Sequence, residues 1–507
     1  MANYFTRMLS KLTSSGKRYY DAAKRTKFTM DWKTNEGSAD KAIQYASKEV
    51  RARSRDLARN NDYVRDYIRQ SKDNVVGEGF SFECKPKEKD GKYDLELGRI
   101  VENNWNEFIK SSEFNINGRA TGNATFGQIL NSCQIDGDIL VHCLVSNNGF
   151  GISVKLYESD HLDGMYNDIN REYNGNLIKM GVEVDVNNRH VAYWIDSKHP
   201  YDFEYISIGT NQYKIRIPAN TENSRAFIVF KADRPDQNRG ISWLASSVTK
   251  LRQIDKYEEA EVIAARIASS KVGFIIPKGG DEYTGQVNDD GNIAMNLEPG
   301  QISVLPEGFD FKEWNPQHPT ANYEAFRRGI LRGIASGLGV SYNMLARDLE
   351  RSSFSSIRAG MMSERDTWKG IQKWFIDSCV RPIYEFWLLI GLRDNLFGIK
   401  NNDVKKTLDK YRKIKFGSTF RGRSWEWVDP MKDVSATILK IESGLSTYEI
   451  ELGKMGLDFE DLVDKRQQEQ EYMKAHGVET QKMTELLIKY GNQASAAADE
   501  PQKDLTK

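Results

Sequence analysis

The spacing of apolar and polar residues along the chain predicts a helical start followed by a mixed region. From Ser38 to about Ser71, apolar residues recur every one or two helical turns, and the charges between them are typical of a solvated helix face. Residues 75–230 combine a short helical pattern at Val101–Ile109 with runs in which apolar and polar residues alternate. The pair Asn187 and Asn188 separates two such runs and predicts a turn between strands. We therefore expect an α+β fold over this region.

Two longer helical segments enclose an acidic stretch. Residues 241–270 keep their apolar positions on one helical stripe, which predicts a single long helix. Residues 272–319 are punctuated by glycine and proline, and their eight acidic residues and two lysines give a local charge of −6. Helical periodicity then returns and ends at Gly337 and Gly339, which favour a helix C-terminus. A small β-rich insertion between two helices is expected.

A polar stretch, residues 341–356, follows the second of these helices. Two arginines, one aspartate and one glutamate give it a formal charge of zero. Beyond it, apolar and aromatic residues follow a helical period that is interrupted by Pro382. Because proline lacks a backbone donor and crowds the preceding turn, we expect a kink near Arg381. Three tryptophans of this segment are interpreted as core residues: Trp368, Trp374 and Trp387.

The two ends of the chain have different patterns. The first thirty residues hold seven basic residues against Asp21 alone, and we expect residues 1–37 to be a mobile basic arm. Weak contact with phosphates and a merely solvated terminus are both compatible with this arm. Short helices are expected after Trp425, opened by capping residues such as Asp429 or Ser446. Residues 493–507 are low in complexity and are expected to be disordered.

Composition narrows the class of protein. A chain of 507 residues corresponds to three or four domains at roughly 100–200 residues each. Lys plus Arg equals Asp plus Glu at 72 each, so binding to nucleic acid would depend on local patches. The four cysteines lack C-x-x-C spacing and are expected to be buried, reduced thiols. The longest apolar run is far below the roughly 20 residues that span a bilayer, so we expect cytosolic folding and no membrane contact.

The sequence offers little chemistry to an enzyme. An ATPase would need G-x-x-x-x-G-K-[ST], which is not found, and the six histidines are scattered without an H-E-x-x-H or G-x-S-x-G motif. We therefore assign no catalytic residue, no cofactor and no metal. One alternative is a carboxylate metal cluster of the nuclease type, but the Asp-Gly pair at its start is the ordinary signal of a hairpin turn. The cluster would consist of Asp136, Asp138, Glu158, Asp160 and Asp163.

Several long blocks, in order, resemble the portal proteins of tailed double-stranded DNA bacteriophages of the lambda type. The most telling are VRARSRDLARNNDYVRDYIRQSKDNVVGEGF, FKADRPDQNRGISWLASSVTKLRQIDKYEEAEVIAARIA, LEPGQISVLPEGFDFKEWNPQHPTANYEAFRRGILRGIASGLGVSY, GVSYNMLARDLERSSFSSIRAG and WEWVDPMKDVSATILKIESGL. The resemblance runs from about Ser38 to Gly477. It implies a ring, usually of twelve subunits, at one capsid vertex, with DNA passing through the middle. Each subunit would have a wing, a two-helix stem joined by a clip, and a crown.

The resemblance implies a portal fold with an α/β wing, a two-helix stem, a β-rich clip, a long kinked helix and an α-helical crown. Carried onto this chain, the parts have the following ranges: wing 38–238, first stem helix 239–271, clip 272–319, second stem helix 320–340, tunnel loop 341–356, kinked helix with the rest of the wing 357–424, and crown 425–492.

The resemblance also implies sites and partners. The tunnel loop would meet DNA, and its zero charge suits a conduit because a surface that neutralises many phosphates would hold DNA tightly. Its expected contact residues are Arg347, Asp348, Glu350, Arg351, Ser352 and Ser353. The acidic clip would dock a motor or adaptor through Asp281, Glu282, Asp289 and Asp290.

The expected partners are other copies of the chain in a ring, double-stranded DNA, the terminase large subunit, the major capsid or scaffolding protein, and a head-completion adaptor. We expect the protein at the portal vertex of the virion, after assembly in the host cytoplasm. The alternative is another structural DNA-binding protein, of a phage or a gene-transfer particle, that does not form the vertex ring.

Overall fold

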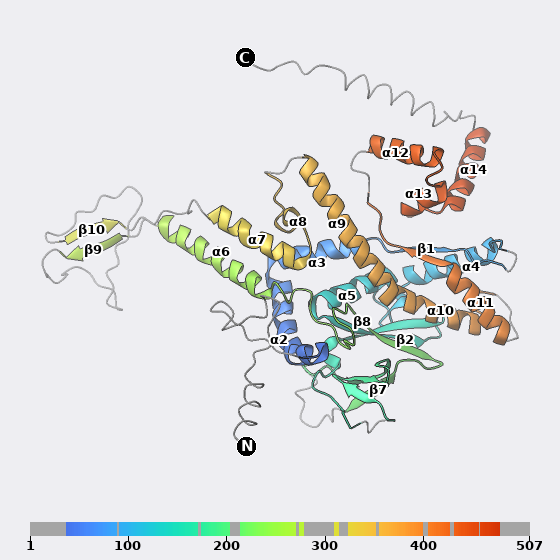
Figure 1. Cartoon of the computed structure of the whole chain (residues 1–507), viewed down its shortest axis with the longest axis horizontal. Coiled ribbons are helices and arrows are strands. Elements are labelled where there is room, and N and C mark those ends of the chain that lie inside the picture. Colours follow the sequence, from blue (N-terminus) through green and yellow to red (C-terminus); the bar gives the residue numbers. More distant parts are fainter. Residues whose placement is uncertain are drawn as a thin grey trace, which may run out of the picture.

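Figure 1 shows the arrangement of the chain in a computed structural model. The described residues combine helices with four small β-sheets, which confirms the expected α+β class. Among them, no helix is both long and apolar enough to cross a membrane. The structure describes residues 37–88, 91–170, 174–202, 213–269, 273–277, 309–313, 323–350, 354–398, 404–425, 430–455 and 457–476. The expected arm and tail, residues 1–37 and 493–507, lie outside this part except for Gly37.

Two helices open the described chain. Helix α2 (Ala39–Asn60) and helix α3 (Asp62–Val75) meet at Asn61, whose backbone is extended. The Asn61 side chain accepts a hydrogen bond from the Val64 amide at 2.9 Å and thereby caps α3. Its amide nitrogen donates to Asp255, far along the chain, at 2.6 Å. The helical pattern predicted from Ser38 to about Ser71 is confirmed, and this contact fixes a corner within it that apolar spacing does not reveal.

The body is built on a three-stranded antiparallel sheet with strand order β3-β2-β8. One face of this sheet lies in the larger of two apolar cores, together with α5 and α10 (Arg381–Arg393). The other face lies in a smaller core with a four-stranded sheet of order β4-β5-β6-β7. Asn188 has a φ of +59° in the turn between β5 and β6, which confirms the predicted turn. The elements are α4 (Leu95–Lys110), η2 (Ser112–Phe114), α5 (Gly122–Ile135), β2 (Asp138–Val145), β3 (Ile152–Glu158), η3 (Ser159–His161), β4 (Leu177–Lys179), β5 (Val182–Val184), β6 (His190–Asp196), β7 (Lys214–Pro218) and β8 (Ser224–Phe230).

A helical arm leaves the body. Helices α6 (Val248–Ser269) and α7 (Tyr323–Leu338) run side by side, and Figure 1 shows them leading away from the sheets toward the strand pair β9 (Gly273–Pro277) and β10 (Phe309–Glu313). This pair agrees with the β-rich character expected there. Helix α6 begins later than predicted because Ser242 holds the preceding turn, donating to the Gln134 carbonyl at 2.9 Å.

The long helix after the arm is interrupted as predicted. Helix α9 (Phe354–Phe375) passes through a π-helical segment (Ile376–Val380) into α10 (Arg381–Arg393), with Pro382 in the first turn of α10. A proline there leaves the carbonyl one turn before it without its usual donor, and a wider turn accommodates this. Trp368 and Trp387 are buried as expected, and Trp374 is half-buried.

Strand β1 (Ser81–Cys84) pairs with β11 (Ser418–Arg421), which follows α11 (Val404–Gly417), and these elements surround an aromatic core with Trp105, Tyr384 and Trp387. All four cysteines are buried and free, as predicted. The chain then forms α12 (Pro430–Glu442), α13 (Tyr448–Lys454) and α14 (Phe459–Ala475). Thr447 caps α13, and not the expected Ser446, while Asp429 lies outside the described residues.

Candidate channel segment and its surroundings

The segment that follows the arm begins at the end of α7 and contains a short helix. Helix α7 ends at Leu338, and the next residue, Gly339, has a φ of +73°, a left-handed conformation that glycine adopts without steric cost. The next amide, of Val340, donates to the Ala335 carbonyl at 3.1 Å and closes the helix end. A short helix, α8 (Tyr342–Ala346), lies inside the stretch that was expected to be a loop throughout, and α9 begins at Phe354.

Ser341 joins the start of α8 to α9. Its hydroxyl accepts a hydrogen bond from the Met344 amide at 3.3 Å and donates to Glu364 at 3.0 Å. Burial raises the pKa of Glu364, and the hydrogen bonds from Ser341, which favour the ionised form, are too weak to reverse this. The contact fixes α8 against the side of α9.

Arg347 is held on the body rather than projecting freely. Its guanidinium forms two hydrogen bonds to Asp66 of α3, each 3.0 Å long, and its backbone is left-handed with a φ of +53°. Gln70, one turn further along α3, donates to the Met344 carbonyl at 3.2 Å. Burial alone would raise the pKa of Asp66, but hydrogen bonds led by those from Arg347 outweigh it and lower the pKa.

Asp348 is bound from the opposite direction, by the arm. Its carboxylate accepts a hydrogen bond from the Tyr342 hydroxyl at 2.7 Å and lies 3.5 Å from the guanidinium of Arg328 in α7. The structure therefore directs Arg347 to α3 and Asp348 to α7. The Glu350 side chain is exposed, and Arg351, Ser352 and Ser353 lie outside the described residues. So do the four clip residues Asp281, Glu282, Asp289 and Asp290.

A polar clamp at the root of the arm was not predicted. Arg327 of α7 donates to Glu258 of α6 at 2.7 Å and to the hydroxyl of Tyr63 in α3 at 2.6 Å, and that hydroxyl donates to Glu258 at 3.0 Å. Burial raises the pKa of Tyr63 to about 12, so the hydroxyl keeps its proton. The three residues come from helices that are far apart in the sequence. The spacing of apolar residues within each helix therefore could not predict this clamp.

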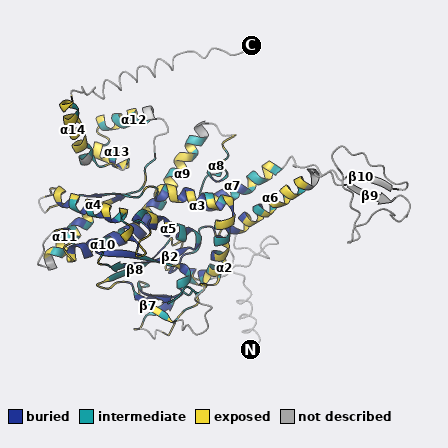
Figure 2. Ribbon diagram, turned by 180° about the vertical axis from the view of Figure 1, so that it is seen from behind, coloured by how far each residue is buried: buried dark blue, intermediate teal, exposed yellow. Residues whose placement is uncertain are grey.

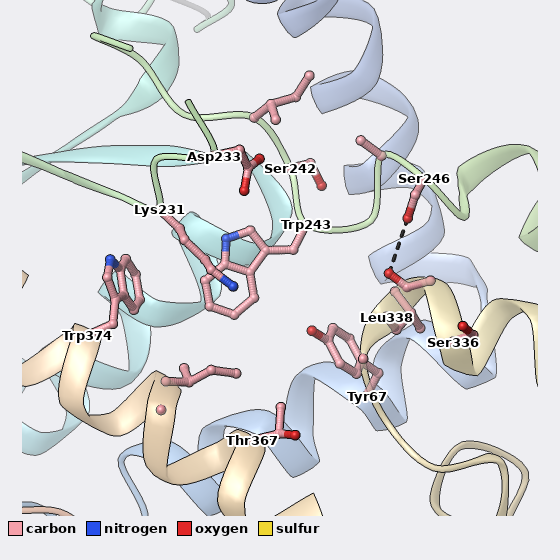
Figure 3. Close-up of a pocket in the computed structure, with 16 residues that line it drawn as sticks. Tyr67, Lys231, Asp233, Ser242, Trp243, Ser246, Ser336, Leu338, Thr367 and Trp374 are labelled. Atoms are coloured by element: carbon pink, nitrogen blue, oxygen red, sulfur yellow. Dashed lines mark hydrogen bonds between the residues drawn. The ribbon is translucent and has the colours of Figure 1, made fainter. Parts of the chain in front are cut away.

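An open hollow of about 510 Å³ lies where the arm meets the body. Figure 3 shows Trp243 and Trp374 on one side of it and the end of α7 on the other. The two indole rings are 5.5 Å apart, and the Lys231 amine lies 5.6 Å from the Trp243 ring. Ser246 donates to the Gly337 carbonyl at 3.2 Å, so the start of α6 and the end of α7 are in direct contact.

The carboxylates considered as a metal cluster are bound by cations of the protein itself. Asp138 is ion-paired with Arg239 at 2.6 Å, Asp136 with Arg55 at 2.6 Å, and the same arginine reaches Asp160 at 2.5 Å. Asp163 is 3.2 Å from the Lys214 amine. Glu158 and Asp160 do lie beside His199, but Arg51 and Arg55 already neutralise Asp160. These ion pairs disfavour the metal-cluster alternative.

The sequence suggested a hairpin turn at the Asp-Gly pair at the start of that cluster. The structure has no hairpin turn at this pair. Asp136 caps the C-terminus of α5, and Gly137, with a φ of +99°, turns the chain directly from that helix into β2. A side chain at Gly137 would collide with the backbone of Ile241, so glycine is required by space as well as by conformation.

Comparison with known proteins identifies the family. Residues 25–372 match the sequence model of the phage portal proteins of the lambda family. The chain is 30% identical over 455 residues to a probable portal protein of Halomonas phage phiHAP-1, which covers 88% of this chain and 85% of the relative. It is 23% identical over 496 residues to portal protein B of Escherichia phage lambda, covering 88% of each chain. The chain belongs to the lambda family of phage portal proteins.

Solved structures with a similar chain path come from gene transfer agent (GTA) particles. The neck of an empty particle is 12% identical with a TM-score of 0.41, covering 84% of this chain and 96% of that chain. The neck of a native particle, computed with C12 symmetry, is 12% identical with a TM-score of 0.35, covering 71% and 91%. Membership of the lambda family, and not these likenesses, makes the protein a structural, non-enzymatic portal component of a bacteriophage virion.

Proposed function

We propose that this chain forms a ring at the unique capsid vertex and that double-stranded DNA passes through the ring during packaging and ejection. One observation carries the proposal: in a chain of the portal family, a two-helix arm leads directly into an ordered polar segment that is fixed on both sides. Membership of the family implies a ring oligomer. A head-to-tail interface whose rotation closes generates a ring without free ends.

The parts of the portal subunit are assigned by order along the chain. The body with α2–α5, the two larger sheets, α10 and α11 is the wing, α6 and α7 are the stem, and the region of β9 and β10 is the clip. The segment after α7 is the tunnel loop, and α12–α14 belong to the crown. In this assignment Arg347, Asp348, Glu350, Arg351, Ser352 and Ser353 line the channel.

The hydrogen bonds and ion pairs that hold Arg347 and Asp348 within the subunit support a positioning role for the channel segment. A charged side chain that is already paired within the subunit offers less binding energy to a phosphate than a free one. The segment would then define the width of the channel without retaining the DNA that slides past it.

The remaining partners follow from the same assignment. The terminase large subunit and the head-completion adaptor would dock on the clip, where the net charge of −6 steers association. The major capsid or scaffolding protein would contact the wing.

The decisive experiment is negative-stain electron microscopy of the purified full-length protein with symmetry analysis. The proposal predicts rings with a central hole, usually of twelve subunits, and light scattering should give a matching mass at micromolar concentration over a range of salt. A protein that stays monomeric under all these conditions would instead support the alternative, a structural DNA-binding protein that does not form the vertex ring.

A further inference from the structure

Helix α11 (Val404–Gly417) is the most basic of the helices that the structure describes. It contains six basic residues and one acidic residue, a net charge of +5, whereas the next most basic helix, α2, has a net charge of +3. The chain as a whole is neutral, with 72 basic and 72 acidic residues. Any contact with nucleic acid therefore depends on a local patch, and α11 provides one.

The inner side of α11 is fixed on the body by balanced ion pairs. The Lys413 amine lies 3.0 Å from the carboxylate of Asp94, and the Lys415 amine lies 3.0 Å from that of Glu385 in α10. Lys413 also pairs with Glu88, and Glu385 also lies 3.5 Å from Arg225. Three cations and three carboxylates thus cancel on this side, and they hold the helix in place without adding to its outward charge.

The outer side of α11 keeps an excess of positive charge. Lys406 and Arg412 are exposed and Lys410 is half-buried, and none of the three has an ion-pair partner within the part of the chain that the structure describes. Asp409, also exposed, is the one carboxylate of the helix, so two positive charges remain in excess on these side chains. Figure 2 shows the contrast between α10, which is mostly buried, and α11, which presents exposed and half-buried residues.

Helix α11 lies far from the arm. Figure 1 shows the strands β9 and β10 at one end of the molecule and α11 near the opposite end, beside α10. In the proposed assignment, β9 and β10 belong to the clip, where the motor and the adaptor dock outside the capsid. The opposite end of the subunit then faces the capsid interior, where the genome is packed. The helices α9 and α10 separate α11 from the channel segment.

Two exposed apolar side chains on α11 do not form a docking patch by themselves. Leu408 is 44% exposed and Phe416 is 84% exposed. They are eight residues apart, about 12 Å along a helix that rises 1.5 Å per residue, and Arg412 lies midway between them. Isolated apolar residues are common on protein surfaces. The charge of the helix therefore favours a polyanion over an apolar protein surface as its partner.

We propose that α11 binds the phosphate backbone of double-stranded DNA packed inside the capsid, through Lys406, Lys410 and Arg412. The inference rests on the proposed function, which places this end of the subunit inside the capsid. Contacts with phosphates are independent of base sequence, as packed genomic DNA requires. Because α11 lies away from the channel segment, it can hold DNA without retaining the DNA that slides through the ring.

Binding of covalently closed circular duplex DNA to preformed full-length rings tests the proposal. A closed circle cannot thread through a closed ring, so it reports only surfaces outside the channel. The slope of log K against log salt is about −0.9 per neutralised phosphate, so replacing Lys406, Lys410 and Arg412 by Gln should make it shallower by about 2.7 for each subunit in contact. The variant Lys406→Arg, Lys410→Arg, Arg412→Lys keeps the charge and should bind like wild type. An unchanged slope in the glutamine variant would overturn the proposal.

A matched variant on α2 controls for the overall charge. Lys41→Gln, Arg53→Gln and Arg59→Gln together remove three positive charges from exposed positions of this helix, which meets the root of the arm. We expect its slope to equal that of wild type. Equal weakening by the α2 variant and the α11 glutamine variant would show that only the total charge matters, which would overturn the site.

Cross-linking in assembled heads identifies what α11 contacts. All four native cysteines are buried, so the new thiol of Arg412→Cys can be labelled selectively with a photoreactive reagent. DNA-filled heads should give adducts with DNA. Adducts with protein alone would overturn the proposal and would indicate an acidic protein surface as the partner.

Microscopy of the same preparations separates this inference from the proposed function. Wild-type rings that do not bind circular DNA at low salt would overturn the role of α11 and leave the ring intact. A wild-type protein that never forms rings would instead contradict the proposed function. The slope measurement would still test α11 in that case, because all three cations belong to one chain.

Discussion

Arg239 and Asp138 form an ion pair inside the protein. The guanidinium donates to both carboxylate oxygens, at 2.6 and 3.1 Å, and the two side chains are 4% and 1% exposed. The same arginine donates to the carbonyls of Met180 and Leu162, at 2.9 and 3.2 Å. The pair therefore connects the start of β2 with the loops on both sides of β4, at the point where the chain turns toward the arm.

Replacing Asp138 by Asn should destabilise the protein by about 3 to 5 kcal/mol, because it leaves the buried charge of Arg239 without a partner. Urea unfolding of the variant measures this. Asp163→Asn is the matched control, since Asp163 pairs with Lys214 at a site that is 39% exposed, and we expect a loss of at most about 1 kcal/mol. Equal losses at the two sites would contradict the argument.

The stability due to Asp138 should also depend on pH in a defined direction. Burial tends to raise the pKa of Asp138, but Arg239 and the other groups around it outweigh burial and lower the pKa. A depressed pKa in the folded state stabilises the fold above the unfolded value of about 3.9 and stops doing so as the pH falls through the folded value. The difference in unfolding free energy between wild type and Asp138→Asn should be constant from pH 5 to 8 and shrink below about pH 4.

The difference in unfolding free energy between wild type and Glu364→Gln should depend on pH in the opposite direction. Because burial raises the pKa of Glu364, its contribution to stability is fully present below the unfolded value of about 4.3 and is lost as the pH rises through the folded value. Glutamine has similar volume, cannot ionise and can still accept from Ser341. The variant should match wild type near pH 4.5 and exceed its unfolding free energy at pH 8. The same difference at both values would show that ionisation is irrelevant.

Gly337→Ala should destabilise the arm, whereas Gly329→Ala should not. A Cβ at Gly337 would lie 2.4 Å from the hydroxyl of buried Ser247, so that side chain must leave its place or α6 and α7 must separate, at about 1 to 3 kcal/mol. A Cβ at Gly329, on the same helix, meets nothing within 4 Å, and alanine there should stabilise by about 0.5 to 1 kcal/mol. Thermal unfolding of the two variants compares them directly, and a stabilised Gly337→Ala would contradict the close contact of the helices.

Replacing Arg347, Asp348, Glu350 and Arg351 by Ala should leave rings intact and impair packaging. Each loss of an exposed ion pair costs about 0.2 to 1 kcal/mol, and the apolar contacts of α8, such as buried Leu345, remain. The measurement is the number of DNA-filled heads assembled with a competent motor. Asp66→Asn is the control, because it releases Arg347 without changing the segment itself. Wild-type filling by the fourfold variant would show that these charges do not engage DNA.

Neutralising Asp281, Glu282, Asp289 and Asp290 together should slow docking of the motor without breaking the ring. Long-range steering by exposed charge is strongest at low salt, where the Debye length exceeds about 10 Å. Association rates measured at several salt concentrations check this. Unchanged rates at low salt would exclude a steering role for these carboxylates.

The sequence predicts local features well where one residue type dominates the outcome. Pro382 alone accounts for the interruption of the long helix, and Asn188 for a turn. Features that depend on distant partners could not be predicted. The corner at Asn61 requires Asp255, and strand β1 requires β11, more than three hundred residues later. The sequence shows that residues 341–356 follow a helix and have a formal charge of zero. It could not show that Arg347 binds Asp66, because the local patterns around these two residues are independent of each other.

The hydrogen bond between Ser246 and Gly337 has a consequence for how the length of the arm can vary. The arm begins and ends one hydrogen bond apart, and its root is held on the body by Asp255, Glu258 and Arg327, so only the part beyond these residues is free of the contacts described for the root. Lengthening an insertion whose ends are already fixed adds little closure entropy, about 0.6 kcal/mol for each doubling. The far part of the arm can therefore be exchanged or resized, and a chimaera that carries the far part of a relative's arm should fold if its junctions are placed beyond Glu258 in α6 and before Arg327 in α7.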